Sequence, residues 1–363
     1  MESRKVQKVG YSTLTISLPS EWAKQNNVAP GDLIFISLER DGTLRVMPGH
    51  IAQREEAEEF IINADACDEA GMLERVIVGC YILGRDVIRV TSSVRIEKEH
   101  VDEIRRIVRK LIGLGILEEA PKNVLLQCSI DPAKFKIDML VRRLSLIAST
   151  ILSEAVQAFV ENDKSLAEEA ISREDEADAI YYLAVRLVLL AQVKPDVAEQ
   201  IGATNILFIP ATRLILQYLE LIADYAEELA SRITEVRAYR KKISKEVVER
   251  IQHIAESAQT VFQKALDCVF SRDIRIANSV LEMRKVLESE VAKFVQEAPE
   301  IPFLRVIVLC LNKIAELGAT IADIAINRSL EEPSKHVENI IQTVKHTRTL
   351  PFPVREKKVI RHV

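Results

Sequence analysis

Apolar and polar residues alternate along the first part of the chain and follow a helical period in most of the rest. Leucine and isoleucine alternate with threonine and serine over residues 13–18, a pattern that predicts a β-strand. The segment 20–27 predicts one or two helical turns, and residues 33–48 predict a hairpin that turns at Asp41-Gly42. The chain therefore begins with a small β-rich head.

The region after the head mixes both periods, and the rest of the chain is helical. We expect a small α/β module with helices over 66–84 and 98–112 and strands over 86–92, 115–119 and 123–129. Beyond it we expect helices over 134–161, 163–193, 197–232, 243–271, 273–298 and 302–329. The last three helices repeat the first three, with Asp163 matching Asp273, which indicates a duplicated three-helix bundle.

The expected fold is multidomain and mainly α. Its parts are a head over 1–50, an α/β linker module over 51–130, bundle repeats over 131–235 and 240–330, and a basic tail over 331–363. A β-rich head of this size buries too little apolar surface to be stable alone. We therefore expect two copies of the head to interleave, which makes the protein a homodimer.

Charge and cysteine content narrow the function classes. The net charge is −5, so an anionic partner such as DNA must be met by a local basic patch. The five cysteines lie far apart without zinc-ligand spacing, which favours free thiols in a reducing cytoplasm. The apolar runs are too short and too interrupted to span a bilayer, so we do not expect a membrane-embedded protein.

Basic residues gather at the start of the head. The candidate DNA-binding residues are Arg4, Lys5 and Lys8 beside the first strand and Tyr11, Ser12 and Thr13 after the Gly10 bend. The same lysines also fit a simpler role, the protection of an exposed sheet edge from pairing with other chains.

The order of motifs in the head resembles the AbrB/SpoVT/MazE swapped-hairpin DNA-binding family. The matching features are the basic first strand, the Gly bend, "SLPSEWAK", the "PGD" turn and the "DGTLRV" hairpin, over about residues 3–48. The resemblance implies a dimeric β-barrel whose first-strand basic residues meet DNA. It differs at the loop after Gly10, which reads Tyr-Ser-Thr without arginine, and some members of the family only dimerise or bind a protein.

Acidic pairs stand out in the first set of helices. Glu174 and Asp178 share a helix face at i,i+4 spacing, as do Glu220 and Asp224 on the next helix. Antiparallel helices would bring the four carboxylates together, and hard cations prefer such oxygen ligands. The alternative is that both pairs are ordinary solvated faces of charged helices.

The duplicated helices, over about 134–330, resemble the PhoU family of phosphate-signalling regulators. "REDEADAI" and "LELIADYAEELA" are similar to that family's second-helix and third-helix motifs. The resemblance implies a metal cluster held by the four carboxylates, with iron, zinc, manganese or magnesium as the divalent ion. In the second repeat the equivalent positions are Arg284, Glu288, Asn312 and Glu316. A cation at the first of these disfavours metal, so we expect the metal in the first bundle alone.

Together these features predict a cytoplasmic, DNA-binding regulator of phosphate uptake or phosphate signalling whose bundles sense a metal or a partner. One alternative is an adaptor without DNA binding, whose head only dimerises and whose bundles dock on a phosphate transporter or a signalling kinase. The other is an enzyme or a metal store. The chain has neither a G-x-x-x-x-G-K nor an H-E-x-x-H motif, so we do not expect an enzyme.

Overall fold

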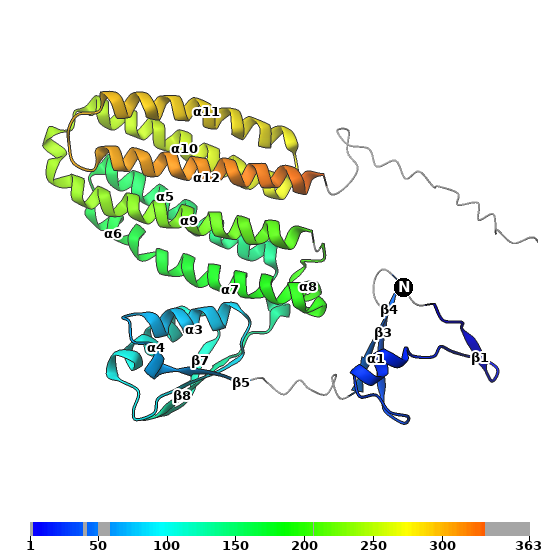
Figure 1. Cartoon of the computed structure of the whole chain (residues 1–363). Helices are drawn as coiled ribbons and strands as arrows, with labels where there is room; N and C mark the ends of the chain where they lie inside the picture. The colour runs from blue at the N-terminus through cyan, green and yellow to red at the C-terminus, as the bar shows by residue number, and fades with distance from the viewer. Residues whose placement is uncertain (1–2, 39–41, 50–58, 206, 331–363) are drawn as a thin grey trace, which may run out of the picture. The chain divides into compact units, whose positions relative to one another are not determined.

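The computed structural model describes residues 3–38, 42–49, 59–205 and 207–330. The expected basic tail at 331–363 and Asp41 of the expected hairpin turn lie outside the described residues. The described chain is mainly helical, with a strand-rich N-terminal segment, a small sheet module and long helices (Figure 1). This confirms the predicted fold class.

The head consists of two separate antiparallel hairpins with a short helix between them. Its elements are β1 (Gln7–Val9), β2 (Thr13–Thr15), α1 (Ser20–Gln25), β3 (Ile34–Leu38) and β4 (Leu44–Pro48). β1 pairs with β2 and β3 pairs with β4, and no closed barrel forms among the described residues of the single chain. Gly10 adopts a φ of 68° at the turn of the first hairpin, where the sequence placed a bend.

Most of the large apolar side chains of the head are exposed. They are Val6, Val9, Leu14, Ile16, Leu33, Phe35, Ile36, Leu38 and Leu44, with exposed fractions from 46% to 75%. A two-stranded hairpin is marginally stable by itself in water. The apolar surface of the head therefore has no cover within the described part of this chain.

The α/β module is a four-stranded sheet with two helices on one side (Figure 1). Its elements are β5 (Glu59–Asn63), η1 (Ala64–Ala66), α3 (Met72–Ile82), β6 (Val87–Thr91), α4 (Lys98–Lys110), β7 (Leu114–Ala120) and β8 (Asn123–Cys128). The strand order is β5-β6-β8-β7, with β5 and β6 parallel and the other pairs antiparallel. Sequence periodicity did not reveal β5, whose "EFIIN" carries only a short apolar run.

The core of the module lies between the helices and the sheet. Leu73 and Ile77 on α3 and Ile107 on α4 are fully or almost fully buried with Ile88 of β6. Tyr81 is buried as well, and its hydroxyl donates a hydrogen bond to the carbonyl of Ile112 at 2.8 Å. The partner satisfies a hydroxyl that would otherwise be costly to bury. The module thus has a hydrophobic core of its own.

The helices that follow the module are η2 (Pro132–Lys134), α5 (Ile137–Glu161), α6 (Lys164–Ser172), α7 (Glu174–Val193), α8 (Pro195–Ile201) and α9 (Phe208–Val236). The two expected helices 163–193 and 197–232 are each divided into two helices in the structure. The expected helix 163–193 is split at Arg173, and a new helix begins at Pro195, where the fixed φ of proline suits a first helical position. α8 ends at Gly202, whose φ of 80° closes the helix with a left-handed cap.

The last three long helices form a three-helix bundle (Figure 1). They are α10 (Lys245–Ser271), α11 (Ile274–Glu297) and α12 (Leu304–Ser329), preceded by η3 (Arg237–Lys242). α10 and α12 approach closely at Gly318, where an added Cβ would lie 3.2 Å from the Cα of Phe262. A side chain at this position would push the two backbones apart.

The two sets of helices repeat each other in their caps. Asn162 and Arg272 adopt almost the same left-handed conformation, with φ of 58° and 57°. The next residue of each, Asp163 or Asp273, accepts hydrogen bonds from backbone N–H groups two residues further along the chain, at 2.8 and 2.9 Å. The predicted alignment of these aspartates therefore corresponds to a shared local structure.

α5 is the one described helix that is long and apolar enough to cross a membrane. Half of its apolar stretch is buried inside the protein. Core helices of folded proteins have the same length and composition, so the property is weak support for a membrane span.

Candidate functional site

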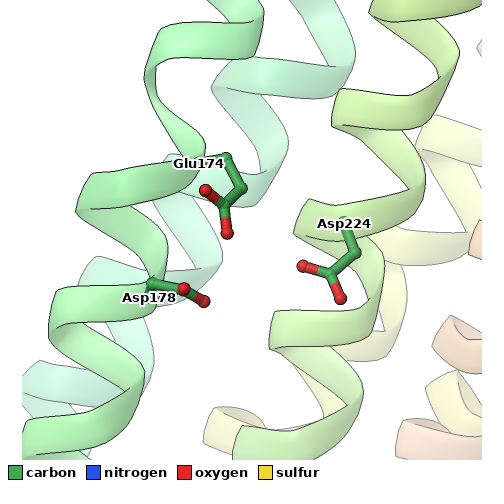
Figure 2. A group of neighbouring side chains, drawn as sticks. All are labelled: Glu174, Asp178 and Asp224. Carbon is green, nitrogen blue, oxygen red and sulfur yellow. The ribbon is translucent and has the colours of Figure 1, made fainter. Parts of the chain in front are cut away.

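Three carboxylates converge on the helices α7 and α9. One oxygen each of Glu174, Asp178 and Asp224 lies within 4.8 Å of the others (Figure 2). Glu174 and Asp178 stand one turn apart at the N-terminal end of α7, where the helix dipole favours negative charge. Asp178 is buried, with 7% of its surface exposed. The cluster is an oxygen-rich site of the kind that could hold a metal ion.

A lysine of the α/β module reaches into this cluster. The Lys110 ammonium lies 2.6 Å from Oδ2 of Asp178, 3.1 Å from Oδ1 of Asp175 and 4.0 Å from Oε2 of Glu174. Lys110 is the last residue of α4, and its side chain is 24% exposed. The module therefore supplies a positive charge to carboxylates that are 64 to 68 residues away in the sequence.

The pKa values of the cluster show how its charges compete. Burial raises the pKa of Glu174 from 4.5 to about 7, and the charge of Asp178 adds to the increase, while Lys110 opposes it. Burial acts to lower the pKa of Lys110, but the hydrogen bond and the charge of Asp178 outweigh burial and raise it. Lys110 is consequently a permanent cation, and Glu174 keeps its proton up to about pH 7.

A second cation also joins the module to α7, but this cation belongs to α7 and its partners belong to the module. Arg186 of α7 is 1% exposed, forms an ion pair with Asp86 and donates hydrogen bonds to the carbonyls of Tyr81 and Arg85 at 2.5 and 3.2 Å. Tyr81 lies in the last turn of α3 and Arg85 lies just beyond it, and a positive charge is favourable at this end of a helix.

Gly84, which lies in the chain between Tyr81 and Arg85, also approaches α7 closely. It has a φ of 82°, and an added Cβ would meet the side chain of Leu190 on α7 at 2.4 Å. The module thus docks on α7 through the ion pairs of two cations, Lys110 and Arg186, and through a close apolar approach.

The head presents its candidate residues to solvent. Arg4, Lys5, Lys8, Tyr11, Ser12 and Thr13 are all exposed. The register of the first hairpin pairs Lys8 with Leu14, so these two share one face of the hairpin, whereas Val9 pairs with Thr13. The Arg4 guanidinium donates a hydrogen bond to the hydroxyl of Ser17 at 3.3 Å. The structure places a basic, accessible arm beside the exposed apolar surface of the head.

Comparison with protein families matches both the head and the helices that carry the acidic cluster. Residues 141–233 match the PhoU domain, and residues 7–53 match "Antidote-toxin recognition MazE, bacterial antitoxin". The chain joins a MazE-like head to a PhoU domain. Comparison with the curated proteins found no match. The suspected architecture is confirmed, and the families of both domains are non-catalytic.

The PhoU domain contains all four predicted acidic residues but does not bring all four together. Asp178, Glu174 and Asp224 form the cluster, whereas the Glu220 carboxylate accepts a hydrogen bond from the Gln217 amide at 2.8 Å. Glu220 precedes Asp224 by one helical turn on α9. Its role as a metal ligand stays a prediction.

The donor set of the PhoU domain fits a hard cation, with one condition. All three groups offer carboxylate oxygens, which suit magnesium, manganese, iron or calcium, and zinc accepts them too. Carboxylates this close repel one another, which favours a bound cation, but Lys110 already provides a positive charge at 2.6 Å from Asp178. A metal ion at this site would therefore have to compete with Lys110 for Asp178. The sequence carried no signal of this contact, because nothing near Asp178 in the chain indicates a partner on α4.

The corresponding face of the second repeat lies outside the matched PhoU range. Arg284 and Glu288 of α11 form an ion pair at 3.4 Å, and Glu316 of α12 pairs with Lys313 at 3.0 Å. Asn312 has a buried amide oxygen without a hydrogen-bond partner. Here the neutralising charges come from the same helices as the carboxylates.

Proposed function

We propose that this protein is a cytoplasmic, DNA-binding regulator of phosphate uptake or phosphate signalling. In this proposal the MazE-like head dimerises and contacts DNA, and the PhoU domain senses a divalent cation or a protein partner. The observation that carries the proposal is the exposed basic arm of a MazE-like head joined to a PhoU domain. No catalytic step is assigned to any residue.

Dimerisation of the head is supported by its uncovered apolar surface. Leu14 and Ile16 in the first hairpin and Phe35 and Ile36 in the second are between 46% and 69% exposed. A second head of the same composition would cover them, since each hairpin alone is marginal. We expect light scattering to find a dimer at micromolar concentration, and a monomer would contradict this part of the proposal.

Contact with DNA is supported by the charges of the arm. Arg4, Lys5 and Lys8 contribute six basic groups in a dimer. Each neutralised phosphate releases about 0.9 counterion, so the log–log dependence of affinity on salt should have a slope of about −5. Fluorescence anisotropy with a labelled DNA duplex, repeated over a range of salt concentrations, measures this slope.

Charge variants test the site of contact. Lys5→Ala with Lys8→Ala removes four charges per dimer, so we expect the slope to fall to about −2 and all sequences to be weakened alike. The matched control is Lys241→Ala with Lys242→Ala, which removes the same charge from exposed positions on η3. Equal loss in both variants, or a signal that does not depend on salt, would contradict DNA contact through the arm.

A cation-sensing role for the PhoU domain is supported by the three converging carboxylates. We propose that the ion is divalent, with iron, zinc, manganese or magnesium as candidates, and that it binds the first repeat alone. The difference between the repeats supports this restriction, because Arg284 and Lys313 belong to the helices of the second face and cannot leave it. Glu174, Asp178 and Asp224 would hold the ion, and the ion would supply a positive charge that Lys110 otherwise provides.

One observation favours a second candidate, an adaptor that binds protein and not DNA. The tip of the first hairpin is Tyr11-Ser12, without a charged residue, and Tyr11 is fully exposed. The MazE family is named for the recognition of a toxin, which is a protein partner. In the adaptor the bundles would dock on a phosphate transporter or a signalling kinase. A dimer that binds no DNA at low salt, and retains a transporter or kinase in a pull-down, would favour it.

A further inference from the structure

Lys110 of the α/β module forms ion pairs with Glu174 and Asp178, two of the carboxylates that fit a metal ion. Lys110 comes from α4 of the module, and its three carboxylate partners all lie in the first five residues of α7. Asp178 is the central group, because it is both the closest partner of Lys110 and a member of the convergent cluster. A single carboxylate thus serves the docking of the module and the binding of a cation.

We propose that Lys110 is a tethered counter-ion which a divalent metal must displace, so that metal binding and docking of the α/β module on α7 oppose each other. The proposal rests on the proposed role of the acidic cluster as a cation site. It assigns a regulatory function to residues 59–128, which neither of the matched domains covers.

Electrostatics make the two cations mutually exclusive. An ammonium 2.6 Å from Asp178 Oδ2 takes one lone pair of this oxygen and fills the space beside it that a metal on this oxygen would need. A divalent ion placed beside a retained ammonium would repel it at a distance of a few ångströms, in a partly buried site where screening is weak. Metal binding therefore requires the side chain of Lys110 to move away.

The structure has room for that movement. Lys110 also lines a cavity of about 310 Å³ together with Gly71, Glu74, Arg75, Ile107 and Tyr182. The cavity offers the carboxylate of Glu74, which accepts a hydrogen bond from Arg106 at 2.9 Å in the present arrangement. A displaced Lys110 can turn toward this carboxylate without becoming an unpaired buried charge.

Displacement would remove one of the two ionic contacts between the module and α7. The other, made by Arg186, stays at the opposite end of the contact and is unaffected by a metal. In the sequence the module lies between the MazE-like head and the PhoU domain. A metal-dependent loosening of the module is thus a route by which the PhoU domain would influence the head.

The test measures metal affinity in the full-length protein with Lys110→Met, which keeps the length of the side chain and removes its charge. Binding of Mn²⁺ is followed by isothermal titration calorimetry, or by the electron paramagnetic resonance signal of free Mn²⁺. We expect Lys110→Met to bind Mn²⁺ at least tenfold more tightly than the wild type. Lys110→Arg keeps the charge and should bind as weakly as the wild type.

A control on the same helix separates this effect from a general change in charge. Lys98→Met removes the same charge from an exposed position about 18 Å away along α4, and should leave the Mn²⁺ affinity unchanged. Hydrogen exchange gives a readout that does not depend on affinity. Added Mn²⁺ should increase exchange in α4 (Lys98–Lys110) of the wild type, and should have little effect there in Lys110→Met.

The outcomes distinguish the two proposals. If Asp178→Asn abolishes Mn²⁺ binding but Lys110→Met binds Mn²⁺ as the wild type does, the cation site stands and the counter-ion role of Lys110 is wrong. If neither the wild type nor Lys110→Met binds Mn²⁺, the cation site fails and the inference fails with it. Slower exchange in α4 on addition of Mn²⁺ would show that metal tightens the module, which also contradicts the inference.

Discussion

The two helical repeats neutralise equivalent acidic faces in different ways. On α7, Glu174 and Asp178 receive the ammonium of Lys110 from a separate module, whereas on α11 the equivalent positions are Arg284 and Glu288, which pair with each other one turn apart. A charge that belongs to the same helix cannot leave its partner, but a charge on another module can. In our proposal, the first face can exchange its cation for this reason and the second cannot.

The largest effect on stability should come from Arg186, the second cation that joins the α/β module to α7. Arg186→Met removes a buried guanidinium that bonds to Asp86 and to two carbonyls of the module. We expect the free energy of unfolding to fall by about 3 kcal/mol in urea denaturation, because the carbonyls of Tyr81 and Arg85 lose their hydrogen-bond donor and Asp86 loses its counter-charge. Asp86→Asn is the control and should cost less, since the side chain of Asp86 is more than half exposed. A neutral Arg186→Met would mean that the module does not depend on α7.

The next largest effect should be the rise in Tm on addition of metal, which should depend on the first repeat and not on the second. A metal at a hundred times its Kd stabilises the folded state by about 2.7 kcal/mol, so Mn²⁺ should raise the Tm of the wild type. Asp178→Asn should abolish this shift, measured against its own metal-free Tm, and Glu288→Gln on the second repeat should retain it. Differential scanning fluorimetry is sufficient. Loss of the shift in both variants would remove the distinction between the two faces.

The pH dependence of stability should follow the protonation of Glu174. Its pKa is raised to about 7 in the folded protein from 4.5, so the folded state holds the proton more tightly than the unfolded state. The contribution of the protonated Glu174 to the free energy of unfolding is complete below about pH 4.5 and is lost as the pH rises toward 7. After allowance for partial exposure, the loss is about 2 kcal/mol.

Glu174→Gln should remove this loss, so its unfolding free energy should stay flat over the same pH range where that of the wild type declines. Glu288→Gln, at the position of the second repeat that corresponds to Asp178, should follow the wild type. Urea titrations at pH 5 and pH 8 measure both. A decline that persists in Glu174→Gln would assign the titration to another group.

The smallest effect is expected on the second repeat. Arg284 pairs only with Glu288, whose side chain is 66% exposed, and its Nε and Nη1 are buried without a hydrogen-bond partner. Arg284→Met should therefore change the unfolding free energy by less than about 1 kcal/mol, and an increase is compatible with this. It should not create a metal response, because Asn312 stands where the first repeat has Glu220. A new Mn²⁺ shift in this variant would show that the arginine alone excludes metal.

Much of the fold could be predicted because it rests on local patterns. The helical period predicted α5, α10, α11 and α12 to within about three residues at each end, and the match of Asp163 with Asp273 corresponds to two N-terminal caps of the same kind. The breaks at Arg173 and near Gly202 were missed, since each depends on how the chain turns in space. β5 was missed because its short apolar run gains its meaning from pairing with β6, more than twenty residues later.

The sequence by itself determined the order of the domains, the acidic pairs and the basic arm of the head. Each is a property of neighbouring residues: alternation along a strand, i,i+4 spacing on a helix, and charge along a short segment. Only the tertiary structure decided that Glu174 and Asp178 meet Asp224 without Glu220, and that Lys110 supplies their counter-charge. Those contacts depend on the packing of α4 against α7, and the burial of Asp178 that makes the charge of Lys110 matter exists only once the chain has folded.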